Sequence, residues 1–105
     1  MKVLPLFPAK KEVFAWVKDG RKTIDVRKGK ARRGEIAVVQ SGTSYLKLKI
    51  VKKETGKLTE VIRQDNYKSV IPTARTREDA LGYLRAIYGT DEGVFTAYHM
   101  AQLKK

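Results

Sequence analysis

The chain has 105 residues, of which 42% are hydrophobic and none is cysteine. This length suits one compact domain, so we expect a single domain over residues 1–105. The lack of cysteine excludes disulfides, thiolate nucleophiles and cysteine-based zinc sites. His99 is the one histidine, and we expect it to be structural, with no metal and no cofactor bound.

The charge is strongly unbalanced, with 23 basic and 11 acidic residues, a net charge of +12 and a pI near 10.1. An excess of one sign favours a polyanionic partner, usually nucleic acid. A membrane partner is disfavoured, because binding to an anionic membrane favours a basic amphipathic helix, whereas the best helices here carry ordinary core faces. No stretch approaches the roughly 18 apolar residues of a membrane span, and we expect no leader sequence. We therefore expect a cytoplasmic protein that binds RNA or a nucleotide. An acidic protein partner is the alternative.

The first elements in the chain are predicted to be a strand and a helix. Lys2–Phe7 is short and apolar, and Pro8 should end it. Ala9–Asp19 carries apolar residues at helical spacing, and Gly20 is a typical residue just beyond a helix end. Trp16 lies at the margin of the apolar face and is expected to join the core.

The next segment alternates between apolar and polar residues over Thr23–Arg27, which predicts a strand. Ile24 and Val26 should meet the core, whereas Asp25 and Arg27 should face a groove or solvent. Residues 28–34 read as a basic, glycine-containing loop.

Two further strands are expected around the turn at residues 41–44. The apolar run Ile36–Val39 predicts a strand buried on both faces. Tyr45–Lys53 alternates, with Leu46, Leu48 and Ile50 directed inward and Tyr45, Lys47 and Lys49 outward.

The C-terminal part predicts a short helix over Leu58–Asp65, an extended Val70–Pro72 segment, a helix after Thr76, and a final strand over Val94–Leu103. Thr76 is a suitable N-cap, and Gly89 a suitable helix end. Five or six short strands with two or three helices favour an α+β fold, a small curled sheet or β-barrel flanked by helices.

The spacing Gly20-x-Lys22-x-x-Asp25-x-Arg27, which follows a proline-containing strand and a helix, resembles the signature of the ASCH domain family in the PUA-like superfamily. Arg33-Gly34-Glu35 before a strand resembles the family's next landmark. The family pattern has glutamate where this chain has Asp25. The resemblance implies a PUA-like β-barrel with a cleft along the signature segment and a link to RNA.

One branch of the family resembles acetylcytidine amidohydrolases, whose catalytic residues are a lysine, a threonine and a glutamate. Lys22 matches the lysine, but Asp25 stands at the threonine position, and no clear glutamate counterpart lies near Thr73–Glu78. The resemblance therefore leaves a small hydrolase, acting on a modified nucleoside or on RNA, as the alternative function, with Lys22 and Asp25 as acid–base groups.

The candidate binding residues combine basic side chains with an aromatic ring and a turn. Lys22 and Asp25 could pair and hold a phosphate, orient a base or transfer a proton. Arginines and lysines of the 27–33 segment could follow a phosphate backbone, and Tyr45 could stack on a base. The full set is Arg21, Lys22, Asp25, Arg27, Lys28, Lys30, Arg32, Arg33, Ser41, Tyr45 and Lys47.

Overall fold

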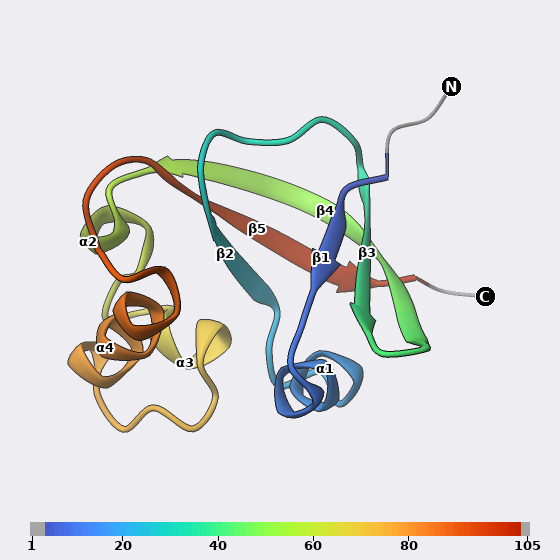
Figure 1. Ribbon diagram of the computed structural model, residues 1–105, viewed down its shortest axis with the longest axis horizontal. Coiled ribbons are helices and arrows are strands. Elements are labelled where there is room, and N and C mark those ends of the chain that lie inside the picture. The colour runs from blue at the N-terminus through green and yellow to red at the C-terminus, as the bar shows by residue number, and fades with distance from the viewer. Residues whose placement is uncertain (1–3, 104–105) are drawn as a thin grey trace.

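Five strands form one mixed sheet that curls into a half-barrel (Figure 1). The computed structural model describes residues 4–103, so the expected start of the first strand at Lys2 lies outside the described residues. The strands are β1 (Leu6–Pro8), β2 (Ile24–Lys28), β3 (Ile36–Ser41), β4 (Ser44–Gly56) and β5 (Phe95–Gln102). Their order is β1-β3-β4-β5-β2, in which β1 runs parallel to β3 and the other pairs are antiparallel.

Four helices accompany the sheet: α1 (Lys11–Lys18), α2 (Leu58–Val61), α3 (Tyr67–Val70) and α4 (Arg77–Tyr88). The α+β fold class with a barrel-like sheet is confirmed, with one helix more than expected. The additional helix is α3, whose last residue Val70 was predicted to be extended. Its position depends on a contact distant in sequence, because Thr23 donates its N–H to the carbonyl of Ser69 at 3.0 Å.

The long strand β4 holds the sheet together, because it pairs with β3 through its first half and with β5 along most of its length. Its pairing with β5 shifts register between Ile50 and Lys52. An extra residue at such a bulge bends the strand and increases its twist. We attribute part of the curl of the half-barrel to this bulge.

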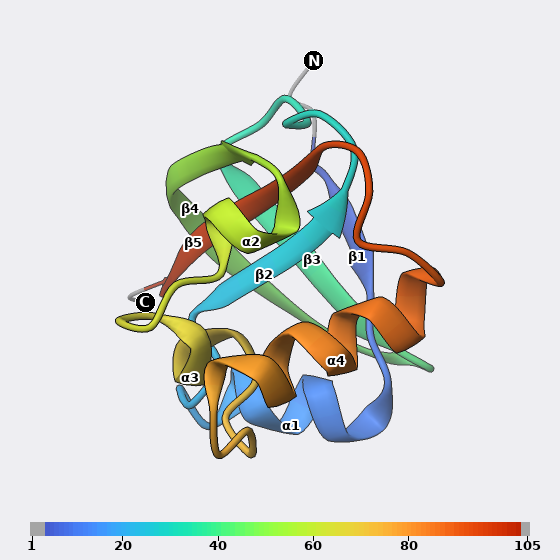
Figure 2. The same cartoon turned by 90° about the vertical axis from the view of Figure 1, so that its left-hand side faces the viewer.

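The sheet contributes to two apolar clusters. The inner cluster fills the half-barrel and includes Phe7, Val39, Leu48 and Tyr98. The second cluster lies between the β2–β5 part of the sheet and helices α2, α3 and α4, which gather on that side (Figure 2). Helix α1 joins both, since Val17 belongs to the inner cluster and Trp16 to the helical one. Trp16 is therefore a core residue, as expected.

The turn after α1 delivers the candidate residues to β2. Gly20 has φ 78°, a conformation that glycine adopts without strain. The N–H of Arg21 bonds to the carbonyl of Trp16 at 2.9 Å and that of Gly20 to Val17 at 3.1 Å, the pair of bonds that defines a Schellman motif. The predicted helix end at Gly20 is thus confirmed, and the chain reverses at this point toward β2.

The ends of α4 also match the sequence-based expectation. The side chain of Thr76 accepts the N–H of Asp79 at 3.1 Å, as an N-cap residue does. Gly89 closes the helix at φ 75°. These local signals fix where α4 begins and ends, and therefore which of its residues reach the sheet.

The outer side of β3 is not fully covered, which corrects the expectation of a strand buried on both faces. Ala37 and Val39 point into the core and are buried, whereas Ile36 and Val38 are only half-buried. The helices pack mainly at the β2–β5 side and at one end of the half-barrel (Figures 1 and 2). Within residues 4–103, no helix is long and apolar enough to cross a membrane.

Candidate functional site

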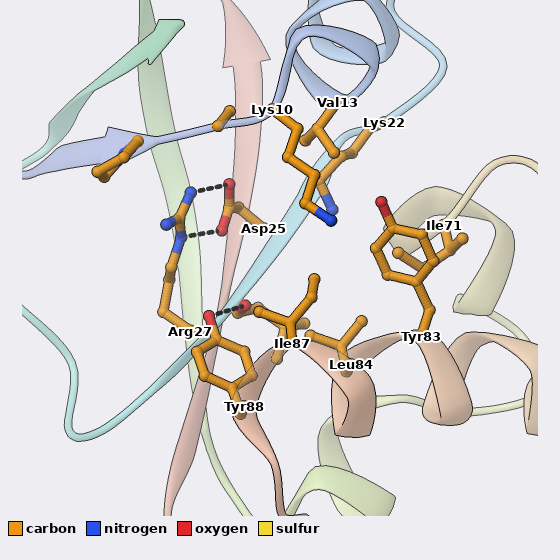
Figure 3. Close-up of a pocket in the computed structure, with 13 residues that line it drawn as sticks. Lys10, Val13, Lys22, Asp25, Arg27, Ile71, Tyr83, Leu84, Ile87 and Tyr88 are labelled. Atoms are coloured by element: carbon orange, nitrogen blue, oxygen red, sulfur yellow. Dashed lines mark hydrogen bonds and ion pairs between the residues drawn. The ribbon is translucent and has the colours of Figure 1, made fainter.

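A pocket with a volume of about 130 Å³ opens where β2 faces α4 and the start of α1 (Figure 3). The strand β2 forms its floor, α4 one wall, and the link from β1 to α1 another. Its lining is mostly apolar or aromatic, with four charged side chains. The lining residues are Pro8, Ala9, Lys10, Val13, Lys22, Asp25, Val26, Arg27, Ile71, Tyr83, Leu84, Ile87 and Tyr88.

The alternation of β2 explains how two charged residues come to line this pocket. Ile24 and Val26 join the helical cluster, so Asp25 and Arg27 point to the other side of the strand. Asp25 is 3% exposed and accepts two bonds from Arg27, at 2.6 Å from Nε and 3.1 Å from Nη2. The carboxylate is therefore held in a fork–fork pair and retains lone pairs for a further donor.

The arginine of this pair gains in turn from the carboxylate. Burial of the Arg27 guanidinium lowers its pKa, but the charge of Asp25 and the hydrogen bond to it outweigh that effect, so that the pKa is raised overall. The guanidinium of Arg27 therefore stays charged throughout the physiological range.

Lys22 lies two residues before β2, with 6% of its surface exposed. Its ammonium donates to the carbonyls of Ile24 at 2.8 Å and Val70 at 2.5 Å. Burial lowers its pKa to about 8, Asp25 opposes this shift and Arg27 adds to it. An ammonium has three donors, so one remains after these two bonds. When the amine is neutral, it offers a lone pair instead.

The expected ion pair between Lys22 and Asp25 is not among the salt bridges of the described residues, and Asp25 pairs with Arg27 instead. The reason is geometric. Lys22 precedes the regular part of β2 and its amine turns toward the carbonyl of Val70 in α3, an element that the sequence did not predict.

Two tyrosines of α4 complete the pocket. The hydroxyl of Tyr88 donates to the carbonyl of Val26 at 3.3 Å, and that of Tyr83 to Glu12 at 3.2 Å. Burial raises the pKa of both phenols. Helical spacing places both tyrosines on the inner face of α4. Core residues share this spacing, so the sequence pattern alone does not distinguish a pocket wall from the core.

The basic loop between β2 and β3 lies outside the pocket lining. Arg32 is already engaged: its guanidinium donates to the carbonyl of Leu6 at 3.0 Å and lies 5.5 Å from the ring centroid of Phe7. Lys28, Lys30 and Arg33 are exposed, as is Arg21 beyond α1. Of the predicted set, the structure thus brings Lys22, Asp25 and Arg27 together at the pocket.

The remaining predicted residues lie on the β3–β4 hairpin. Ser41 and Tyr45 flank its turn, and Tyr45 is 63% exposed. Lys47 follows on the same outer side of β4. Tyr45 therefore does not line the pocket.

The single histidine belongs to a separate polar cluster. His99 Nε2 lies 2.7 Å from Glu54 Oε1, and Arg63 donates to the other oxygen of Glu54 at 2.9 Å. The hydrogen bond from Arg63, with that from His99, lowers the pKa of Glu54 to about 2 although burial opposes the shift. No group of three potential metal ligands occurs within residues 4–103.

The charge is distributed unevenly over the molecule. Residues 57–93, which include α2, α3 and α4, carry six basic and six acidic side chains. Residues 4–56 and 94–103, which include all five strands, carry fourteen basic and five acidic side chains. The positive excess of the described residues therefore belongs to the sheet and α1, the same part that supplies the charged side chains of the pocket.

Comparisons with known proteins give the fold. The crystal structure of the hypothetical protein PH0355 superposes with a TM-score of 0.77, covering 96% of this chain and 100% of that chain at 14% sequence identity. No protein-family model matches the chain, and no curated protein matches it. At this identity the likeness concerns the architecture alone, which is compatible with the half-barrel sheet of a PUA-like fold.

Proposed function

We propose that this protein is a PUA-like domain of the ASCH type that binds a nucleotide, free or within RNA, with the base in the pocket. One observation carries the proposal: Lys22, Asp25 and Arg27, which belong to one short sequence segment, line the same pocket. The opposite wall of that pocket contains Tyr83 and Tyr88. The segment is the one that resembles the ASCH signature. The net charge of +12 supports an anionic ligand.

The size of the pocket suits one aromatic ring. A cavity of about 150 Å³ holds a single benzene molecule, and this pocket has about 130 Å³. Apolar walls from Val13, Leu84 and Ile87 would contact the faces of such a ring. A base also needs hydrogen-bond partners at its edge, because its polar groups lose water on entry.

The polar groups of the pocket supply both a hydrogen-bond donor and a hydrogen-bond acceptor. The ammonium of Lys22 has a donor to spare after its two carbonyl bonds, and the carboxylate of Asp25 has acceptor capacity beyond Arg27. A base edge that carries a carbonyl beside an N–H would satisfy both. The sugar and phosphate would remain outside, near the exposed Lys10.

The test is titration of the protein with nucleoside monophosphates, followed by two-dimensional NMR. We expect saturable shifts of the amides of residues 22–27 and 83–88, and loss of binding in Ile87→Trp, which fills the pocket from an exposed position. Ala86→Trp adds the same ring at a neighbouring exposed site that does not line the pocket, and should bind as the unmodified protein does. Equal binding by both variants would disprove the pocket assignment.

A second candidate function is that of a small hydrolase, and the state of Lys22 favours it. An amine with a pKa of about 8 exchanges its proton close to neutral pH, as a general acid or base must. Against turnover, Asp25 has no hydroxyl and is held by Arg27. Glu78 is exposed on α4 and does not line the pocket, so residues 73–78 bring no carboxylate there.

The dependence on pH separates the binder from the enzyme. If Lys22 only donates to the ligand, affinity should fall as the pH rises through about 8, and no product should form from acetylcytidine or RNA. If Lys22 is a base, turnover without added metal should increase over the same interval and vanish in Lys22→Met. We expect the first outcome, and product formation that depends on Lys22 would reverse the ranking.

A further inference from the structure

The outer side of β4 carries a row of exposed residues that the pocket does not use. Tyr45, Lys47 and Lys49 alternate with inward residues and are all exposed, and Tyr45 is 63% exposed. Side chains two residues apart on a strand lie roughly 6.8 Å from each other. No salt bridge within residues 4–103 involves either lysine. The row thus offers unneutralised positive charge beside an aromatic ring.

This row begins close to the rim of the pocket. Tyr45 pairs with Gln40 on β3, and Gln40 pairs with Pro8 on β1, which lines the pocket. Residues paired across neighbouring strands share a face of the sheet, and all three are exposed. Two strand spacings, or roughly 10 Å, therefore separate the rim from Tyr45. A chain that leaves the pocket over Pro8 would meet Gln40 and then Tyr45.

At the other end of the row, an acidic residue neutralises the positive charge. Beyond the bulge, Lys52 lies 3.5 Å from Glu54, which Arg63 and His99 also contact. Beyond this cluster lies the electrically balanced part of the molecule, residues 57–93. The free positive charge on this face therefore extends from Tyr45 to Lys49 and stops at the Glu54 cluster.

We propose that Gln40, Tyr45, Lys47 and Lys49 form a second binding surface, for single-stranded nucleic acid, which starts at the pocket rim and follows the outer side of β4. Single strands are bound by cationic rows that follow the backbone and by aromatic rings on which bases stack. A duplex keeps its bases stacked on one another, so Tyr45 could not use its ring there. The amide of Gln40 donates to the carbonyl of Gly42 at 3.1 Å and keeps an acceptor oxygen and a second N–H, which would bridge the step between the pocket and Tyr45.

Fluorescence anisotropy with a labelled 12-nucleotide oligouridine and its oligothymidine equivalent tests this surface. In Lys47→Gln/Lys49→Gln, the slope of log affinity against log salt should become shallower by about 1.4, at roughly 0.7 per lost phosphate contact. Tyr45→Ala should weaken binding between about 5-fold and 150-fold, as loss of a stacking ring does. If the substitutions weaken binding of both oligomers equally, the surface contacts the backbone and stacks on bases. If they weaken binding of the RNA alone, the surface contacts the 2′-hydroxyl.

The matched control is Lys57→Gln/Lys68→Gln, which removes two exposed lysines from the balanced part of the molecule. It should keep the affinity and salt slope of the unmodified protein. The proposal fails if the control and the outer variants weaken binding equally, or if the outer variants bind normally. It also fails if polyglutamate competes as well as the oligonucleotide, since that would identify an acidic protein as the partner, or if Tyr45→Ala weakens a duplex equally.

The outcome for this surface is separable from that for the pocket. The outer variants should bind nucleoside monophosphates normally, because none of the four residues lines the pocket. Ile87→Trp should lose the mononucleotide yet keep the contribution of Tyr45 to oligonucleotide binding. A protein that binds oligonucleotides through Tyr45 but no mononucleotide would disprove the pocket function and leave the outer surface standing.

Discussion

The guanidinium of Arg27 lies 4.8 Å from the ring centroid of Phe7, although the two residues belong to strands that do not pair. β1 and β2 are the two ends of the sheet, and the half-barrel is open between them. The contact is a cation–π interaction with a fully buried ring. Because Arg27 also holds Asp25, one side chain links the open seam of the sheet to the charged group of the pocket.

The Asp25–Arg27 pair should be necessary for stability as well as for binding. Asp25→Asn should lower the free energy of unfolding by about 3 kcal/mol, since breaking a buried pair costs roughly 3–5 kcal/mol and Arg27 keeps some access to water. Urea denaturation measures the change. Asp25→Asn/Arg27→Met should lose less than the two single changes added together, and strict additivity would argue against the pair.

Stability should rise with pH over the range in which Lys22 titrates. Its pKa is about 8 in the folded protein, below the ordinary lysine value of 10.5 that applies to the unfolded chain, so between these values the unfolded chain binds more protons. Stability therefore increases with pH there, by at most about 1.4 kcal/mol per pH unit. Unfolding at pH 7.5 and 9.5 should show this increase, and Lys22→Met should lack it. If the stability of Lys22→Met depended on pH as that of the unmodified protein does, the effect would not come from a buried Lys22.

Acid should destabilise the protein through Glu54. The pKa of its carboxyl is about 2 in the folded state, below the ordinary glutamate value of 4.5, so its contribution is complete above pH 4.5 and declines toward pH 2. Partial exposure limits the size of the effect through solvent screening. The melting temperature of Glu54→Gln should fall less between pH 5 and 2.5 than that of the unmodified protein. Glu78→Gln, at an exposed position, should show the full decline.

RNA affinity should depend steeply on salt, with a log–log slope of roughly −3 to −4 for about four to six phosphate contacts on a single strand. Lys30→Ala/Arg33→Ala removes two exposed charges of the β2–β3 loop and should make the slope shallower by about 1.4 if both contact phosphate. Arg32 is unsuitable for this test because it bonds to Leu6 and contacts Phe7. An unchanged slope would remove the loop from the binding surface.

Local signals predicted much of this fold because they act over a few residues. The alternation of β2 correctly directed Ile24 and Val26 to the core, and Gly20 and Thr76 correctly marked helix boundaries. The helix α3 escaped prediction, because a four-residue turn docked on Thr23 through Ser69 carries almost no signal of its own.

The composition of the pocket could not be predicted in full, because it depends on distances between residues that are far apart in the sequence. The signature segment contains Lys22, Asp25 and Arg27, and these three residues line one pocket. The tyrosines of α4 were missed because a pocket wall and a core face share one periodicity. Strand alternation predicts that Tyr45 faces outward, whereas its distance from the pocket follows from the register of β1, β3 and β4, which the sequence does not contain.

The hydrogen bonds of the open seam have a consequence for solubility. A free strand edge presents unpaired carbonyls that can recruit another chain. Here Lys22 donates a hydrogen bond to the carbonyl of Ile24 on β2, and Tyr88 donates to that of Val26. Arg32 donates to the carbonyl of Leu6 on the short strand β1. Two residues that line the pocket therefore also protect an edge of the sheet. Their replacement would favour aggregation as well as weaken ligand binding.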